Sequence, residues 1–104
     1  MQVQVNETTL TGKQKRFLRA MGSTLDPVVQ IGKSGVIDTV TESAEQALAA
    51  REIIKVRVLQ NSPEEPKAAI AALAKATGAE LVQVIGRNGL LYKKNEEKSK
   101  IELP

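Results

Sequence analysis

Cysteine, histidine and tryptophan are absent from this 104-residue chain, which has one phenylalanine and one tyrosine. The missing cysteine excludes disulfides and thiol chemistry, and the missing histidine removes both the usual zinc ligands and the commonest acid–base catalyst. With aromatic residues at 2% of the sequence, Phe17 and Tyr92 are too few to form a sheet that stacks nucleobases. Phe17 is instead expected in the core. No paired carboxylates or nucleophile constellation stand out, so we assign no catalytic residues, metal ligands or cofactor.

Long hydrophobic runs are also missing, and no apolar stretch approaches the length that spans a bilayer. Residues 1–9 lack the basic start and apolar middle of a secretion signal, so we interpret them as a flexible leader and expect a cytoplasmic location. Hydrophobic residues at 41% and charged residues at 26% are ordinary for a folded chain. We predict one globular domain at residues 10–94, followed by a charged, loosely held tail at residues 95–104.

Acidic residues are absent between Thr8 and Leu25, although the net charge of the whole chain is only +3. Thr11 followed by Gln14 is the pattern of a capping box and predicts a helix over residues 12–21. An exposed helix usually mixes charges of both signs, so a helix with one sign favours a polyanion partner. An ordinary solvated face is the alternative. The basic residues of this helix are Lys13, Lys15, Arg16 and Arg19.

The remaining patterns predict four strands and two further helices. Alternation in residues 53–59 places Ile54, Val56 and Val58 toward the helices and leaves Lys55 and Arg57 on the other face of the sheet. The other strands are expected at residues 28–31, 80–85 and 90–93. Together these elements give the order αβαβαββ and an α+β fold, a two-layer sandwich in which three helices cover a four-stranded mixed sheet.

Capping and turn residues predict where these elements begin and end. Asp38 or Thr39 is expected to cap the second helix, and Ser62 is expected to cap the third helix. Gly78 suits the position just after the third helix. The Asn-Gly pair at residues 88–89 predicts a hairpin that makes the last two strands antiparallel neighbours.

The most informative stretch is the loop Gly32, Lys33, Ser34 and Gly35, which follows the first strand and precedes the second helix. A nucleotide-binding P-loop would need a glycine where Pro27 stands, so that interpretation fails. A G-x-x-G loop beside a lysine suits an RNA backbone, because glycine lets the chain approach phosphates closely. Residues 86–89 repeat the G-x-x-G letters as an expected β-turn, in which Arg87 is a candidate for an extra phosphate contact.

These motifs, in this order, resemble the CRM (chloroplast RNA splicing and ribosome maturation) domain family in its bacterial stand-alone, YhbY-like form. The stretches that carry the resemblance are LTGKQKR (10–16), PVVQIGKSG (27–35), REIIKV (51–56) and LVQVIG (81–86). The resemblance implies a fold similar to the C-terminal domain of translation initiation factor three, RNA binding, and association with the precursor of the large ribosomal subunit. It also implies that residues 32–35 form the family's G-x-x-G loop and that the helix at residues 12–21 is its basic helix.

The leading hypothesis is therefore a monomeric, non-enzymatic RNA-binding protein that contacts ribosomal RNA during assembly. It needs no membrane and no small-molecule substrate. The alternative is a protein-interaction adaptor, in which the alanine-rich third helix or an open sheet edge docks another protein and residues 32–35 form only a turn. An enzyme is the third possibility, and activity of the isolated protein on RNA or nucleotides would reveal it.

Overall fold

The computed structural model describes residues 10–104, so the expectation of a flexible leader at residues 1–9 lies outside the described part. The elements follow the predicted order αβαβαββ. They are α1 (Gly12–Gly22), β1 (Pro27–Ile31), α2 (Asp38–Arg51), β2 (Ile53–Val58), α3 (Pro66–Thr77), β3 (Glu80–Ile85) and β4 (Asn88–Tyr92).

The four strands form one mixed sheet in the spatial order β1-β2-β4-β3. β1 and β2 are parallel and connected through α2, whereas β4 is antiparallel to both of its neighbours, β2 and β3. β4 therefore lies between two strands that α3 connects in sequence. The predicted α+β class, the four-stranded mixed sheet and the antiparallel pairing of the last two strands are confirmed.

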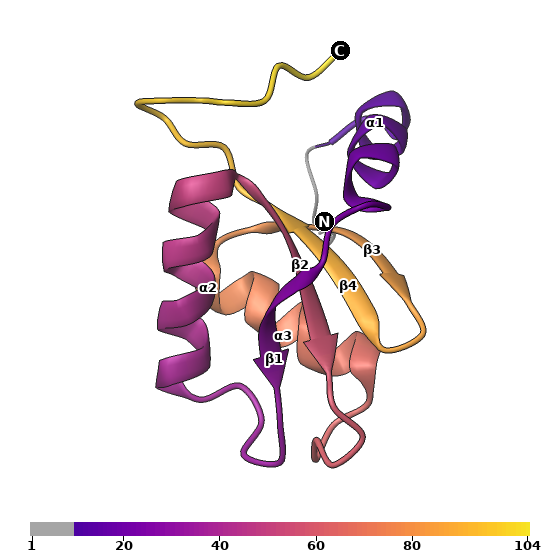
Figure 1. Ribbon diagram of the computed structural model, residues 1–104, viewed down its shortest axis with the longest axis vertical. Coiled ribbons are helices and arrows are strands. Elements are labelled where there is room, and N and C mark those ends of the chain that lie inside the picture. Colours follow the sequence, from indigo (N-terminus) through magenta and orange to yellow (C-terminus); the bar gives the residue numbers. More distant parts are fainter. Residues whose placement is uncertain (1–9) are drawn as a thin grey trace, which may run out of the picture.

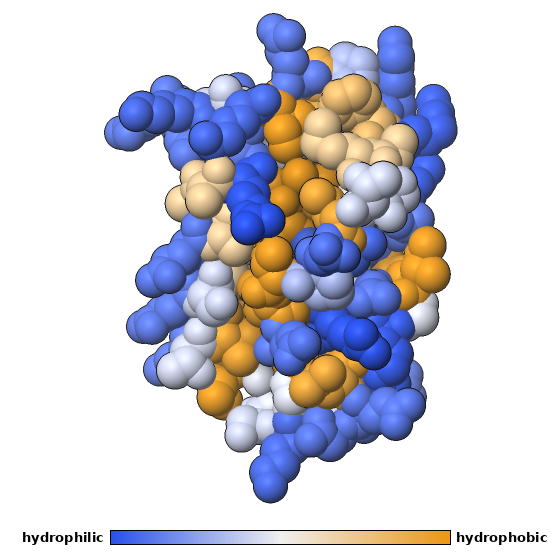
Figure 2. All heavy atoms as spheres, in the orientation of Figure 1, coloured by the Kyte–Doolittle hydropathy of each residue, from blue (hydrophilic) through white to orange (hydrophobic). Residues whose placement is uncertain are grey.

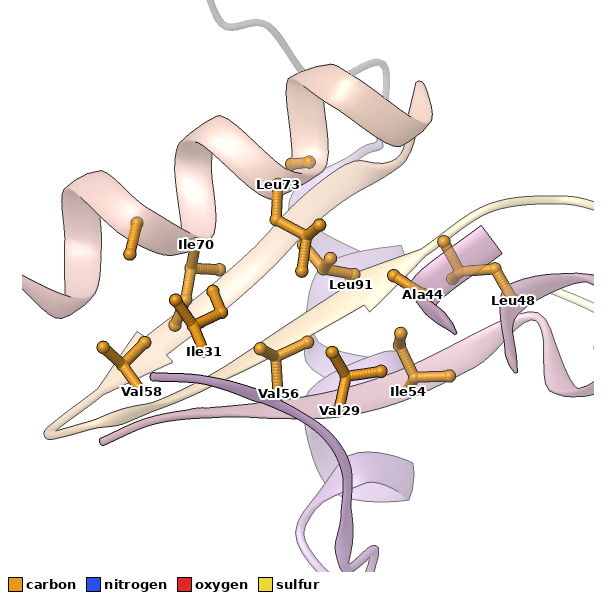
Figure 3. Close-up of a cluster of buried hydrophobic side chains, with 12 residues drawn as sticks. Val29, Ile31, Ala44, Leu48, Ile54, Val56, Val58, Ile70, Leu73 and Leu91 are labelled. Atoms are coloured by element: carbon orange, nitrogen blue, oxygen red, sulfur yellow. The ribbon is translucent and has the colours of Figure 1, made fainter. Parts of the chain in front are cut away.

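The larger hydrophobic core lies between one face of the sheet and helices α2 and α3. Ile54, Val56 and Val58 of β2 are fully buried there, as the alternation of the sequence predicted. In Figure 3, Ile70 and Leu73 of α3 point onto side chains of the sheet. Burial of each such side chain stabilises the fold by roughly 1.5–3 kcal/mol before conformational entropy is counted.

Helix α1 covers the opposite face of the sheet, so the expected two layers are in fact three. Its buried Leu18 packs in a second cluster with Ile53, Leu90 and Tyr92, and these side chains alternate with residues of the first core. In Figure 1, α3 lies behind the strands and α1 lies at the top right. Phe17 was predicted in the core but is 37% exposed, because Leu18 and Met21 take the positions against the sheet.

The predicted capping box of α1 is confirmed, and α2 begins at Asp38, within the expected residues 37–39. The expected cap of α2 and the expected start of α3 are wrong. Gln14 N–H donates to Thr11 Oγ1 and Thr11 N–H donates to Gln14 Oε1. The N-cap of α2 is Ile37, which provides no side-chain cap. α3 starts at Pro66 rather than after Ser62, because Pro66 fits the first helical position and Glu65 is extended.

The hairpin between β3 and β4 exists, but its two-residue turn is Gly86–Arg87 rather than the Asn-Gly pair. Ile85 pairs with Asn88, and Gly86 has a φ of 58°, which suits the first central position of a type II′ turn. Gly89 lies within β4, where a Cβ would stand 2.5 Å from Cδ1 of Ile70. This glycine therefore serves the close packing of α3 against the sheet.

The C-terminal segment, expected to be loosely held, is attached to the domain. The buried carboxylate of Glu52 accepts hydrogen bonds from the backbone N–H groups of Asn95, Lys100 and Ile101 at 2.6, 2.6 and 2.8 Å. Ile101 and Leu103 pack against the cluster beneath α1. The segment at residues 95–104 thus helps to enclose the second core.

Candidate nucleic-acid interface

The loop at residues 32–35 is a tight turn that carries two exposed residues at its tip. Gly35 N–H donates to the carbonyl of Gly32 at 3.0 Å, and Ile37 N–H then donates to the carbonyl of Gly35 at 3.1 Å. Lys33 and Ser34 between them are exposed. Within residues 10–104, no acceptor binds the backbone N–H groups of these two residues. The tip therefore offers two amide donors and a lysine side chain to an anion.

Glycine stands at two positions of this loop for different structural reasons. Gly35 is buried with a φ of 76°, in the left-handed region that favours glycine, and a Cβ there would lie 3.4 Å from Pro63. Gly32 has no positive φ, and a Cβ there would meet only Leu59, at 3.8 Å. Gly35 is thus required by the turn, whereas a Cβ at Gly32 would make only an ordinary van der Waals contact.

Arg87 lies at the same end of the sheet as the glycine loop, although 52 positions separate it from Gly35 in the sequence. Its Nε donates to the carbonyl of Val58 at 2.8 Å, and its Nη2 donates to the carbonyl of Leu59 at 2.7 Å. Leu59 N–H in turn donates to the carbonyl of Ile31, the residue before the loop. Arg87 therefore holds the end of β2 and brings a positive charge close to the loop, with part of its guanidinium already engaged.

The four basic residues of α1 lie at the other end of the molecule. In Figure 1, the loop between β1 and α2 is at the bottom and α1 is at the top. Lys13 and Arg16 are exposed, while Lys15 and Arg19 are half-buried. Within the described chain, none of the four forms an ion pair with an acidic side chain. The structure thus separates two basic sites that the sequence had left unplaced relative to each other.

Lys55 and Arg57 lie on the sheet face that α1 partly covers, as the alternation of β2 predicted. In Figure 2, which has the orientation of Figure 1, a band of apolar atoms on this side of the molecule is bordered and interrupted by hydrophilic side chains. No sequence pattern pointed to Gln83 and Asn88, which β3 and β4 bring next to Lys55. Lys55, Gln83 and Asn88 lie close together only because β4 pairs with both β2 and β3.

The only tyrosine of the chain is structural. Tyr92 is 4% exposed, and burial, followed by the negative charges of Glu52, Glu80 and Glu96, raises the pKa of its hydroxyl. Its ring is enclosed in the cluster beneath α1 and offers no face to a ligand. Among residues 10–104, no group of acidic side chains is arranged to hold a metal ion, and no helix is long and apolar enough to cross a membrane.

Comparison with known proteins identifies similar sequences along almost the whole chain. The model of the CRS1 / YhbY (CRM) domain family matches residues 10–93. The Bacillus subtilis protein named "Probable RNA-binding protein YqeI" is 50% identical over 95 residues, which cover 91% of this chain and 99% of that protein. A Haemophilus influenzae protein named "RNA-binding protein" is 41% identical and is matched over 97% of its length.

A plant relative and a solved structure extend the comparison. The maize chloroplastic group IIA intron splicing facilitator CRS1 is 32% identical over 75 residues, which are 72% of this chain but only 10% of that protein. The solution structure of a Staphylococcus aureus protein, 45% identical, superposes with a TM-score of 0.78 and covers 92% of this chain and 100% of its own. The sequence and the fold therefore agree on the same relatives.

Proposed function

Because this chain belongs to the CRS1 / YhbY (CRM) domain family, we propose that it is an RNA-binding protein that assists assembly of the large ribosomal subunit. In this proposal it contacts precursor ribosomal RNA through the G-x-x-G loop and through the basic face of α1. Its action is binding without catalysis, so it requires no cofactor. It works in the cytoplasm as a monomer, with ribosomal RNA as its partner.

The tip of the loop at residues 32–35 carries the proposal. Backbone N–H groups without an internal acceptor bind phosphate oxygens well, and the exposed side chain of Lys33 adds attraction. The lack of a side chain at Gly32 lets a sugar-phosphate backbone approach the tip closely. These contacts involve phosphates rather than base edges, so they predict strong dependence on salt and weak dependence on RNA sequence.

The basic face of α1 supplies the second contact in this proposal. The five residues of β1 rise about 16 Å between the end of α1 and the loop, which is more than a single phosphate can bridge. One RNA molecule therefore reaches both sites only if it follows the sheet face or folds around the edge of the domain. Structured ribosomal RNA has the size for this arrangement, whereas a mononucleotide does not.

The experiment compares two variants at one position that differ only in charge. A Cβ at position 32 would make only an ordinary contact with Leu59, so Gly32→Asp and Gly32→Asn are both expected to fold. Binding to a large-subunit precursor RNA fragment is measured at several salt concentrations. We expect Gly32→Asp and Lys33→Glu to bind the RNA more weakly than Gly32→Asn does. For these two variants the slope of log affinity against log salt concentration should be smaller in magnitude by roughly 0.7–0.9 for each phosphate that the variant no longer neutralises.

Lys75→Glu is the control for a simple change of net charge, because Lys75 is exposed on α3, on the far side of the sheet from α1. Its affinity should remain close to that of the unmodified protein. Equal binding by Gly32→Asp and Gly32→Asn, or a salt slope near zero for the unmodified protein, would contradict phosphate binding at the loop. If Gly32→Asp and Lys33→Glu still co-sedimented fully with large-subunit precursors, the adaptor interpretation would replace it.

A further inference from the structure

A recess with both polar and apolar lining lies between the end of α1 and the uncovered part of the sheet. Gly22 forms one wall, because α1 approaches β4 so closely that a Cβ on Gly22 would stand 2.5 Å from Cδ1 of Leu90. The strands contribute polar side chains and an apolar floor. The lining side chains are Ser23, Lys55, Gln83, Ile85, Asn88 and Leu90.

One atom in this recess has no partner within the described chain. Oδ1 of Asn88 is buried, yet it accepts no hydrogen bond. A buried amide oxygen without a donor destabilises the folded state, so native structures rarely keep one without a reason. A donor on a ligand in the recess would satisfy this oxygen once the amide of Asn88 turns toward the ligand.

The other groups around Asn88 complete a set of donors and acceptors. The register of the sheet places Lys55 and Gln83 on either side of Leu90, and Asn88 lies two residues away on the same strand. Amide side chains both donate and accept, as the edge of a nucleobase requires, and the lysine supplies one positive charge for a phosphate. The exposed side chain of Ile85, at 64%, offers an apolar surface at the rim.

We propose that this recess binds one unpaired nucleotide of RNA, with its base edge read by the amides of Gln83 and Asn88 and its phosphate held by Lys55. This inference rests on the proposed function, and it adds recognition of bases to a protein whose other contacts are to the backbone. An unpaired base is required because only a base that has left its helix presents its edge to a pocket. A purely anionic ligand would leave both amides without a role.

The test measures base preference separately from overall affinity. The unmodified protein, Gln83→Ala and Asn88→Ala are titrated with four single-stranded pentaribonucleotides, each made of one base. Gln30→Ala is the matched control, because Gln30 is exposed on the same sheet face but outside the recess. Side-chain amide signals of Gln83 and Asn88 in the unmodified protein are followed by NMR in the same titrations, so the result does not depend on the variants folding.

We expect the unmodified protein to distinguish the best base from the worst by at least about fivefold, and the amide signals of Gln83 and Asn88 to shift on binding. Gln83→Ala and Asn88→Ala should reduce this preference toward equality, while Gln30→Ala retains it. Binding of all four oligonucleotides with equal affinity and without these shifts would overturn the recess proposal and leave backbone binding intact. If the protein bound neither these oligonucleotides nor the precursor RNA fragment, both proposals would be overturned.

Discussion

At the scale of single residues, the glycines of this chain show how one amino acid serves several purposes. Gly35 is needed for its backbone conformation, whereas Gly22 and Gly89 are needed because a neighbouring side chain occupies the place of a Cβ. Gly89 follows Asn88 and looks like half of a turn in the sequence. Its actual neighbour is Ile70 of α3, a residue far away along the chain.

The packing at Gly89 gives a residue-level prediction. Gly89→Ala should lower the free energy of unfolding by about 1–3 kcal/mol, because the new methyl group overlaps Cδ1 and Cγ2 of Ile70. In an Ile70→Val background, which lacks Cδ1, the same substitution should cost less. Urea unfolding of the four proteins in a double-mutant cycle measures this coupling. Equal costs in both backgrounds would show that Cδ1 of Ile70 is not the obstacle.

Glu52 shows how one residue at the end of α2 can hold a distant segment. It has a φ of 67°, is fully buried, and binds the backbone of the C-terminal segment through both carboxylate oxygens. Burial raises the pKa of the Glu52 carboxyl, but the N–H donors of Asn95, Lys100 and Ile101 outweigh it and hold the pKa below its ordinary value of 4.5. The charged carboxylate is therefore favoured in the folded protein.

This depressed pKa predicts how stability depends on pH. Since the unfolded chain takes up a proton at Glu52 at higher pH than the folded protein does, the stabilisation is complete above pH 4.5 and is lost as the pH falls through the folded-state pKa. Glu52→Gln should cost about 1.5–3 kcal/mol at pH 7, because a charged acceptor of three N–H groups is removed.

Urea unfolding between pH 3 and pH 7 measures the stability difference between the unmodified protein and Glu52→Gln. The difference should shrink toward acid pH, where the glutamate is itself neutral. Glu45→Gln, at an exposed position of α2, is the control and should differ little from the unmodified protein at any pH. A Glu52→Gln difference that stays constant across this range would contradict the proposed role of the charge.

At the scale of elements, the capping residues of a helix were predictable only where the cap is local. Thr11 and Gln14 cap each other over three residues, and Gly78 takes the left-handed position after α3 with a φ of 72°. Asp38 and Thr39 also had the chemistry of caps, but the chain leaves the glycine loop in a path that makes Ile37 the N-cap. The loop geometry, set by residues before the helix, determined this start.

At the scale of the whole molecule, the two basic sites that the sequence singled out lie at opposite ends of the sheet, with Lys55 and Arg57 of β2 on the sheet face between them. The glycine loop and Arg87 lie at one end of the sheet, and the basic residues of α1 lie at the other. Both ends belong to one rigid frame, because β1 joins α1 to the loop and pairs with β2. An RNA that touches both ends must span the sheet between them.

This separation predicts additive effects on RNA binding. Lys33→Glu and Arg16→Glu lie too far apart to share a phosphate, so their effects on the free energy of binding to a large-subunit precursor RNA should add within about 0.3–0.5 kcal/mol. With a short oligonucleotide that occupies one end only, one of the two substitutions should have little effect. Filter binding with both lengths of RNA tests this, and strongly non-additive effects with the long RNA would indicate a single shared contact.

Features that depend on near neighbours along the chain follow from the order of the residues alone. The period of β2 fixed which of its side chains face α2 and α3, and the capping pair fixed the start of α1. The G-x-x-G pattern of residues 32–35 predicts a turn, because Gly35 adopts a left-handed conformation that other residues rarely adopt. Each of these features arises from steric contacts and hydrogen bonds within a few residues, so the local sequence is enough to predict it.

How these parts lie relative to one another depends on the packing of the folded domain. It placed α1 on the opposite sheet face from α2 and α3, separated the two basic sites, and attached the C-terminal segment to Glu52. It also brought Lys55, Gln83 and Asn88 together through strand pairing. Such contacts join residues that are distant in sequence, and their geometry depends on which strand inserts between which others, a choice made by the packing of the whole domain.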